Sequence, residues 1–178
     1  MLNGFAKNSM PEEYTGGIGK EGVKNLKKFV EDGGTLVFLN RASRFAIEQF
    51  DLPVRDVTEG LPRKDFYIPG SILRTEVNTD AKLARFMDTE SIAWFENSPA
   101  FEITMSDDTN VEIIASYPKD PKQILLSGWA LGAEKIAGKA ALVSINIGKG
   151  KIVLFGFRPQ YRGQSLATFS LFFNAITN

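Results

Sequence analysis

Arginines that follow two apolar segments are the side chains in this sequence best suited to bind a ligand. Arg41 and Arg44 follow the apolar run Thr35–Leu39, and FGFRPQYRGQS, residues 155–165, follows a second one. If both runs are parallel strands, their carboxyl ends share one edge, where open α/β sheets bind ligands. Guanidinium groups bind carboxylates and phosphates in pairs of hydrogen bonds. The predicted anion-binding or interdomain surface consists of Arg41, Arg44, Arg158, Gln160, Tyr161, Arg162 and Gln164.

A structural role for the same arginines stays open at this point. Arginines at loop crossings often pair with acidic side chains and fix loops, and this chain has 21 acidic residues to pair with its 21 basic ones. Pairing of that kind would leave no free guanidinium for a ligand.

A glycine pattern near the start has the spacing of a dinucleotide-binding loop. Gly17, Gly19 and Gly22 form G-x-G-x-x-G. A nucleotide site also needs a strand before the first glycine and an acidic residue about 20 positions further on, after the next strand. The preceding residues 1–16 contain no strand-like run, and Asn40 follows the Thr35–Leu39 strand. We therefore predict a glycine-rich entry to a helix, and no nucleotide cofactor.

The composition limits the available chemistry, because the chain has no cysteine and no histidine. This excludes Cys-His and Ser-His-Asp nucleophiles and metal sites made of thiolates or imidazoles. We predict a protein without catalytic residues, bound metal or cofactor. The alternative is a hydrolase that acts on a glycan through two carboxylates about 5 to 9.5 Å apart. No spacing in the sequence predicts such a pair.

The balanced charge argues against nucleic-acid and membrane partners, because the 21 basic and 21 acidic residues produce no overall field. The apolar runs are strand-sized, well short of the roughly 20 residues that span a bilayer. The first residues lack a basic segment followed by an apolar one, so we predict no signal peptide within this chain.

Periodicity and turn residues predict alternating elements at both ends of the chain. Apolar spacing favours helices over 19–32 and 43–50, with a buried strand at 35–39 between them. Ser165 caps a last helix, whose buried side is predicted as Phe169, Phe172, Phe173 and Ile176. Strands are predicted at Phe66–Ile68, Ser71–Val77, Ile92–Phe95, Ala100–Ile103, Val111–Ala115, Gln123–Leu126, Ala140–Ile147 and Lys151–Phe157, with turns at Asp107–Asn110 and Gly148–Gly150.

These elements predict one α/β domain over residues 1–178. The fold class is α/β, with a β-rich middle at about 54–120. The last two strands are antiparallel, because their turn is short. The first helix has no strand before it, so we expect the first βαβ unit to be missing from this chain. An edge left open in this way favours self-association, and a homo-oligomer is one expected state.

Several motifs in order resemble one known family. The chain resembles the C-terminal region of large bacterial secreted zinc carboxypeptidase-type proteins, where a class I glutamine amidotransferase-like domain follows the peptidase domain. The motifs are MPEEYTGGIGKEGV (10–23), LKKFVEDGGTLV (26–37), PGSIL (69–73), LSGW (126–129) and FGFRPQYRGQS (155–165).

The resemblance implies a three-layer α/β sandwich of flavodoxin-like or amidotransferase-like type, with a β-rich insertion and an antiparallel edge. It also implies a peptidase domain as partner, and a periplasmic or extracellular location. The peptidase family uses His-x-x-Glu with a distant histidine, and amidotransferases use a Cys-His-Glu triad. Neither set can occur in this chain, which lacks both histidine and cysteine. We therefore expect a non-catalytic accessory domain that has a structural role or positions a peptide or glycan. A sensor of a small anionic ligand is a further alternative.

Overall fold

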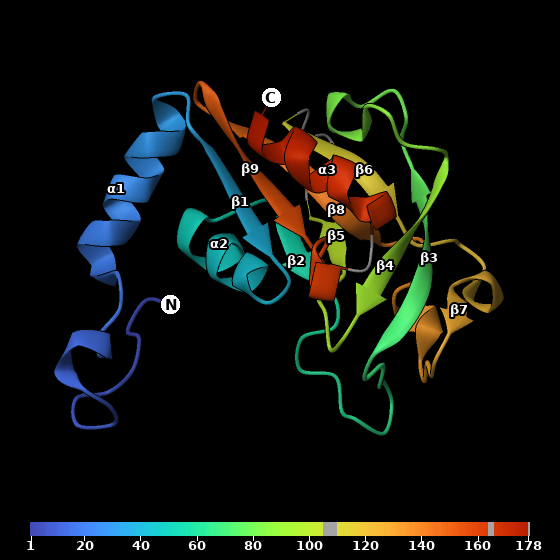
Figure 1. Ribbon diagram of the computed structural model, residues 1–178, viewed down its shortest axis with the longest axis horizontal. Coiled ribbons are helices and arrows are strands. Elements are labelled where there is room, and N and C mark those ends of the chain that lie inside the picture. The colour runs from blue at the N-terminus through green and yellow to red at the C-terminus, as the bar shows by residue number, and fades with distance from the viewer. Residues whose placement is uncertain (105–109, 164–165, 178) are drawn as a thin grey trace.

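One mixed sheet forms the centre of the protein. The computed structural model describes residues 1–104, 110–163 and 166–177 (Figure 1). In these ranges nine strands form a sheet with the main order β1-β9-β8-β6-β3-β4, while β2, β5 and β7 pair beside this path. The strands are β1 Thr35–Leu39, β2 Val54–Asp56, β3 Ser71–Val77, β4 Glu90–Phe95, β5 Phe101–Ile103, β6 Val111–Ser116, β7 Leu125–Ser127, β8 Ala140–Ile147 and β9 Gly150–Phe155.

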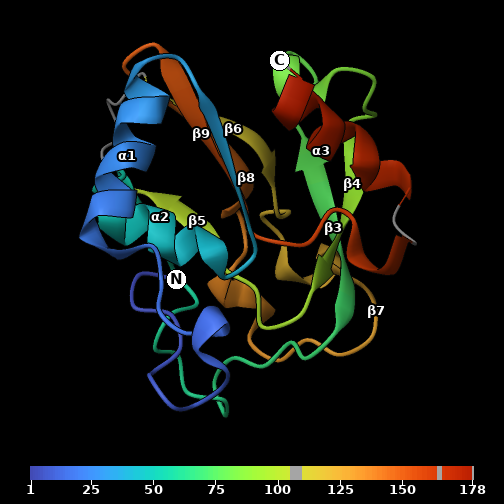
Figure 2. The same cartoon turned by 60° about the vertical axis from the view of Figure 1, so that its left-hand side comes forward.

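Three α-helices cover the two faces of this sheet, namely α1 Gly19–Glu31, α2 Ala42–Phe50 and α3 Leu166–Thr177. Val30 of α1 and Ala46 of α2 share one apolar core with Phe38 of β1. Leu171 of α3 belongs to the other core, with Phe155 of β9. Figure 2 shows α1 and α2 on one side of β1 and α3 on the other. The predicted three-layer α/β fold is therefore confirmed.

The two neighbours of β9, β1 and β8, run in the directions considered in the sequence analysis. β1 runs parallel to β9, so that Thr35 lies opposite Lys151 and Leu39 opposite Phe155. β8 and β9 are antiparallel, as their short turn predicts. The parallel pair places the carboxyl ends of β1 and β9 at one edge, which is the condition that the predicted arginine surface needs.

The first helix begins without an incoming strand. Residues 1–18 contain the short 3₁₀ turn Glu12–Tyr14 and a single bridge between Phe5 and Gly16. α1 then buries Val23 and Val30 and ends at Glu31, shortly before Gly33, whose φ of 117° suits glycine. The glycine pattern at 17–22 thus leads into a helix, as predicted.

Two predicted strands and one helix face differ from the structure. Phe66–Ile68 is a loop with one bridge, from Tyr67 to Leu131, because Pro62 and Pro69 bracket it. Residues 121–123 form a 3₁₀ turn begun by a proline, so β7 starts only at Leu125.

Helix α3 buries only part of the predicted side. Its buried residues are Thr168, Leu171 and Ala175. Of the predicted residues, Phe169 and Phe172 are half-buried, whereas Phe173 and Ile176 are 54% and 53% exposed. Eight of the twelve residues of α3 are apolar and none is charged, so the apolar positions do not single out one buried face. The predicted cap Ser165 and residues 107–109 of the predicted turn Asp107–Asn110 lie outside the described residues.

Glu102 joins β2 and β5 to the start of β8. Its carboxylate accepts hydrogen bonds from Lys139 and from Nε of Arg55, the latter at 2.6 Å. The hydrogen bond from Lys139 and then that from Arg55 hold the pKa of Glu102 below its usual value. A lowered pKa in the folded state stabilises the fold at neutral pH, and this contribution is lost as pH falls through the lowered pKa.

Replacement of Glu102 should therefore have a pH-dependent effect. We expect Glu102→Gln to lower the Tm at pH 7, and the difference from wild type to shrink as the pH falls below about 4, where an unfolded glutamate is protonated. Thermal denaturation, followed by circular dichroism at several pH values, measures this difference in Tm. Glu112→Gln, an exposed change on β6, is the control. A Tm difference between Glu102→Gln and wild type that stays constant down to pH 3 would contradict the role given to the Glu102 carboxylate.

Candidate functional site: an arginine pocket at the end of β1

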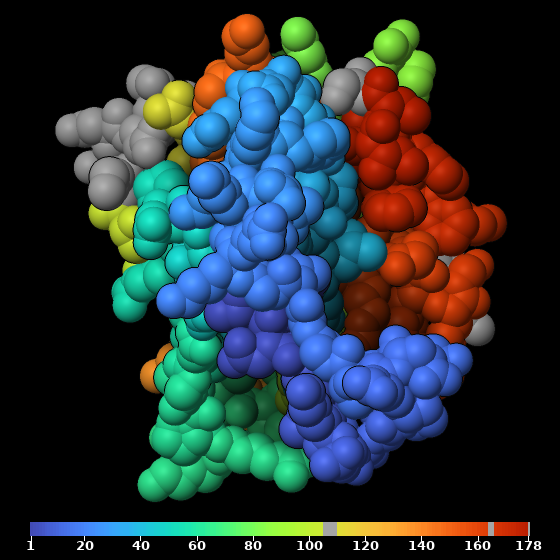
Figure 3. All heavy atoms as spheres, turned by 90° about the vertical axis from the view of Figure 1, so that its left-hand side faces the viewer, coloured from blue at the N-terminus to red at the C-terminus, as the bar shows by residue number. Residues whose placement is uncertain are grey.

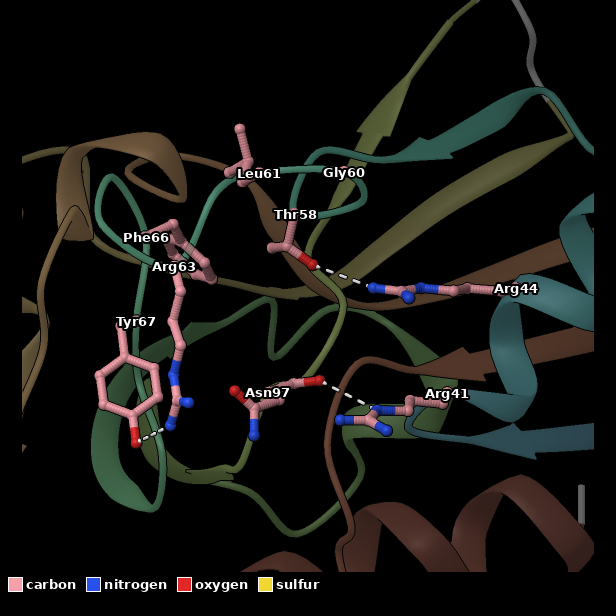
Figure 4. Close-up of a pocket in the computed structure, with 9 residues that line it drawn as sticks. All are labelled: Arg41, Arg44, Thr58, Gly60, Leu61, Arg63, Phe66, Tyr67 and Asn97. Atoms are coloured by element: carbon pink, nitrogen blue, oxygen red, sulfur yellow. Dashed lines mark hydrogen bonds between the residues drawn. The ribbon is translucent and has the colours of Figure 1, made fainter.

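A pocket of about 460 Å³ opens beside the carboxyl end of β1. Figure 4 shows Arg41 and Arg44 on one side of it and Arg63 with Tyr67 on the other, with Asn97 between them. The residues that line it are Arg41, Arg44, Thr58, Gly60, Leu61, Arg63, Phe66, Tyr67 and Asn97. Three arginines and no carboxylate face this space, so its lining suits an anion.

A tight turn between β1 and α2 positions the first two arginines. Asn40 has a left-handed backbone with φ of 52°, a conformation that asparagine tolerates better than most residues. Its side chain is buried, donates from Nδ2 to Ser98 Oγ at 2.9 Å and accepts from the Arg41 N–H at 2.7 Å. The turn directs the chain into α2, so that Arg41 and Arg44 reach the pocket.

The same turn has the backbone of a catalytic elbow but carries no nucleophile. A strand, a left-handed residue and a helix form the backbone of a nucleophile elbow, where the central residue normally carries the attacking atom. Here that position holds Asn40, whose amide oxygen and nitrogen are both hydrogen-bonded. The turn therefore serves to position Arg41 and the Ser98 loop.

Asp56 fixes Arg44 from below the pocket. Its side chain is 1% exposed, and Oδ2 accepts from Arg44 Nε at 2.6 Å. Oδ1 accepts from the N–H and the hydroxyl of Thr58 at 2.9 and 2.8 Å, and from the Ala100 N–H at 3.3 Å. This carboxylate compensates the charge of Arg44 and joins α2 to the loops at 57–60 and 97–100.

Arg41 and Arg63 keep uncompensated charges. Arg41 Nε donates to the Asn97 carbonyl at 3.4 Å, and Arg63 donates to the Tyr67 hydroxyl at 2.6 Å. The Arg63 guanidinium also lies 4.2 Å from the centre of the Tyr67 ring. Within the described residues neither arginine forms an ion pair with a carboxylate. The pocket therefore carries net positive charge, and both guanidinium groups retain donors for a ligand.

The structure brings only part of the predicted surface into this pocket. Arg158 forms an ion pair with Glu96 at 2.6 Å and lies 5.5 Å from the Tyr161 ring centre. Arg162 lies 5.2 Å from the same ring, and Tyr161 stacks on Trp94 at 4.9 Å. These residues form a separate cluster around Trp94 of β4, and none of them lines the pocket. Gln160 is exposed, and Gln164 lies outside the described residues.

Several pocket residues were missed by sequence reasoning. Arg63 and Tyr67 lie in the loop between β2 and β3, and Thr58 and Asn97 follow strand ends. One local signal was present, since Pro62 and Pro69 bracket a segment that is too irregular for a strand and carries both Arg63 and Tyr67.

The described residues contain no group of three acidic side chains placed to hold a metal ion. No helix among them has the length and apolar character to cross a bilayer. Burial, and to a lesser extent the charge of Asp56, raise the pKa of Tyr117 far above its usual value, so this core hydroxyl stays protonated.

Comparisons with known proteins identify the fold. No protein-family model and no curated protein matches the chain. Among solved structures, a protein described as a GMP synthase subunit from Thermoplasma acidophilum is similar at 13% identity, with a TM-score of 0.51 over 88% of this chain and 63% of that one. The chain has a class I glutamine amidotransferase-like fold.

Two other structures show the same amidotransferase-like fold. A cytoplasmic protein from Salmonella typhimurium has a TM-score of 0.52 at 13% identity, over 90% of this chain and 61% of that one. A ThuA-like protein from Parabacteroides merdae has a TM-score of 0.50 at 10% identity, over 89% and 63%. The chain thus spans 61–63% of the length of these neighbours.

Removal of the Asp56 carboxylate should destabilise the protein. Asp56→Ala leaves Arg44 without its partner and the N–H groups of Thr58 and Ala100 without an acceptor. We expect a loss of about 3 kcal/mol in the free energy of unfolding, measured by urea denaturation. Asp88→Ala, at an exposed position, should change it by less than about 0.5 kcal/mol. Equal effects of the two substitutions would contradict the role given to Asp56.

Proposed function

We propose that this chain is a non-catalytic binding domain whose arginine pocket holds a small anionic ligand. One observation carries the proposal: Arg41 and Arg63 face one pocket, and neither forms an ion pair with a carboxylate of the described residues. Both arginines are exposed to solvent, and their free N–H donors would form charge-assisted hydrogen bonds with a bound anion.

The size and charge of the pocket favour a small ligand with two negative charges. About 460 Å³ lies in the range of small-molecule sites. Arg44 is neutralised by Asp56, so two net positive charges remain, on Arg41 and Arg63. A phosphate monoester or a dicarboxylate matches this charge, while Thr58, Tyr67 and Asn97 supply neutral polar atoms.

The lining supports binding over hydrolysis. A glycan hydrolase of the predicted kind needs two facing carboxylates, and the residues that line the pocket include no aspartate or glutamate. Asn40 occupies the elbow where a nucleophile would stand, and the sequence contains no cysteine or histidine.

The role of the domain in a larger protein belongs to the same proposal. The sequence resemblance to carboxypeptidase-type proteins supports an accessory domain that positions a ligand, such as an anionic peptide or glycan end, near a peptidase domain. Gln160 and Arg162 are exposed beside Tyr161 and suit a contact between domains.

Titration with simple anions tests the pocket. We expect inorganic phosphate and citrate to raise the Tm and to bind in isothermal titration calorimetry, with affinity that falls as salt is added. Arg41→Gln and Arg63→Gln should each weaken binding about tenfold or more, because each removes a charged hydrogen bond. Arg85→Gln removes an exposed arginine outside the pocket and is the matched control.

Two results would contradict the proposal. One is an absence of binding by phosphate, citrate and a panel of phosphorylated sugars. The other is binding that survives Arg41→Gln and Arg63→Gln but is lost in Arg162→Gln, which would place the anion site at the Tyr161 cluster instead.

A further inference from the structure

Two large apolar side chains are exposed in the segment that follows β7. Trp129 is 63% exposed, and Leu131, two residues further on, is 40% exposed. Folded proteins bury tryptophan extensively on average, and exposed apolar groups that lie together often mark a binding surface. The backbone pairing of this segment connects both side chains to the arginine pocket.

Tyr67 forms that connection. It lines the pocket, and it pairs with Leu131 through two backbone hydrogen bonds of 3.0 and 3.1 Å. Opposite residues of an antiparallel pair have their side chains on the same face. Ile68 is buried in the core and Ala130 packs against the core. Because side chains alternate along extended segments, Tyr67, Leu131 and Trp129 share the outward face, and we call these three residues the apolar strip.

The backbone around Trp129 is fixed by its neighbours. Oγ of Ser71, which is 1% exposed, accepts from the Trp129 N–H at 2.9 Å and donates to the Trp129 carbonyl at 2.7 Å. Gly132, with φ of 78°, approaches the β2–β3 loop so closely that a Cβ there would clash with the Asp65 carbonyl oxygen. An exposed ring on a fixed backbone is preorganised for a ligand, because little freedom is lost on binding.

The apolar strip continues the pocket on the side away from Arg41. The Arg63 guanidinium bonds to the Tyr67 hydroxyl and lies over the Tyr67 ring, so Tyr67 belongs to both surfaces. Figure 4 shows Tyr67 at the end of the pocket opposite Arg41. Trp129 is the diagonal neighbour of Tyr67, a relation that spans about 7–8 Å and is within reach of aromatic side chains. Figure 3 shows the β2–β3 loop, in green, projecting at the lower end of the molecule.

We propose that the ligand of the arginine pocket is an organic anion with an aromatic group, and that this group binds to the apolar strip. The inference rests on the proposed function, in which Arg41 and Arg63 hold the phosphate or carboxylate. A pocket of about 460 Å³ has room for more than the anionic group alone. Aromatic groups pack on tryptophan and tyrosine rings with a gain beyond the area that they bury.

The apolar strip favours an aromatic group over a sugar. The side chain of Leu131 has no hydrogen-bonding atom, and the Tyr67 hydroxyl already accepts a hydrogen bond from Arg63. The hydroxyl groups of a sugar would lose water at this surface without gaining new partners. An aromatic ring carries no such cost.

Two phosphate monoesters of equal charge test the inference. Methyl phosphate and phenyl phosphate are both dianions at pH 8 and differ in the ring. We expect phenyl phosphate to bind about tenfold more tightly in isothermal titration calorimetry. Trp129→Ala should remove this advantage and leave the affinity for methyl phosphate unchanged, because Trp129 does not hold the anion. Phe86→Ala, which removes an 81% exposed ring between β3 and β4, is the matched control.

Fluorescence provides a second readout in which Trp129 stays in place. The chain has two tryptophans, and Trp94 stacks on Tyr161. In Trp94→Phe, Trp129 is the only remaining tryptophan. Phenyl phosphate should shift its emission to shorter wavelengths, because the bound ring displaces water from the indole, and methyl phosphate should not.

The outcomes distinguish this inference from the proposed function. Equal affinity for the two esters, with methyl phosphate binding dependent on Arg41 and Arg63, would overturn the inference and leave the proposed function standing. A preference for phenyl phosphate that survives Trp129→Ala would also overturn it. So would a greater dependence on Trp129 for glucose 6-phosphate than for phenyl phosphate. Binding of neither ester would contradict both proposals.

Discussion

The arrangement of the arginine pocket depends on one buried carboxylate. Asp56, at the end of β2, accepts hydrogen bonds from Arg44 on α2, from Thr58 in the following turn and from Ala100 before β5. Helix α2, the turn after β2 and the residue before β5 thus share one buried acceptor. Because a buried charge must be paired, this contact fixes both the pocket floor and the loop that carries Asn97.

The same contact determines which arginines remain free to bind a ligand. Asp56 neutralises Arg44, and Glu96 neutralises Arg158 on the other side of the 96–98 loop. Arg41 and Arg63 have only a carbonyl and a hydroxyl as partners, so the positive charge of the site is concentrated on them. The proposed function follows from this distribution of charge, and less from the number of arginines in the chain.

Local patterns in the sequence predicted the elements that frame the site. The Gly33–Gly34 stop, the apolar strand after it and the short turn at 148–150 were sufficient for α1, β1 and the β8–β9 hairpin. The pocket itself was predicted only in part. Arg63 lines it from the irregular loop between β2 and β3, whose path no periodicity in the sequence predicts. The predicted buried side of α3 was wrong at Phe173 and Ile176, because apolar residues surround this uncharged helix on more than one side.

The central claim is that Arg41 and Arg63 together bind an anion. The most direct test is a titration with inorganic phosphate, followed by NMR of the arginine Nε–Hε groups in ¹⁵N-labelled protein. The account predicts saturable shifts of Arg41 and Arg63, with smaller changes at Arg44 and none at Arg158 or Arg162. Shifts confined to Arg158 and Arg162, or weak shifts of every exposed arginine without saturation, would contradict it.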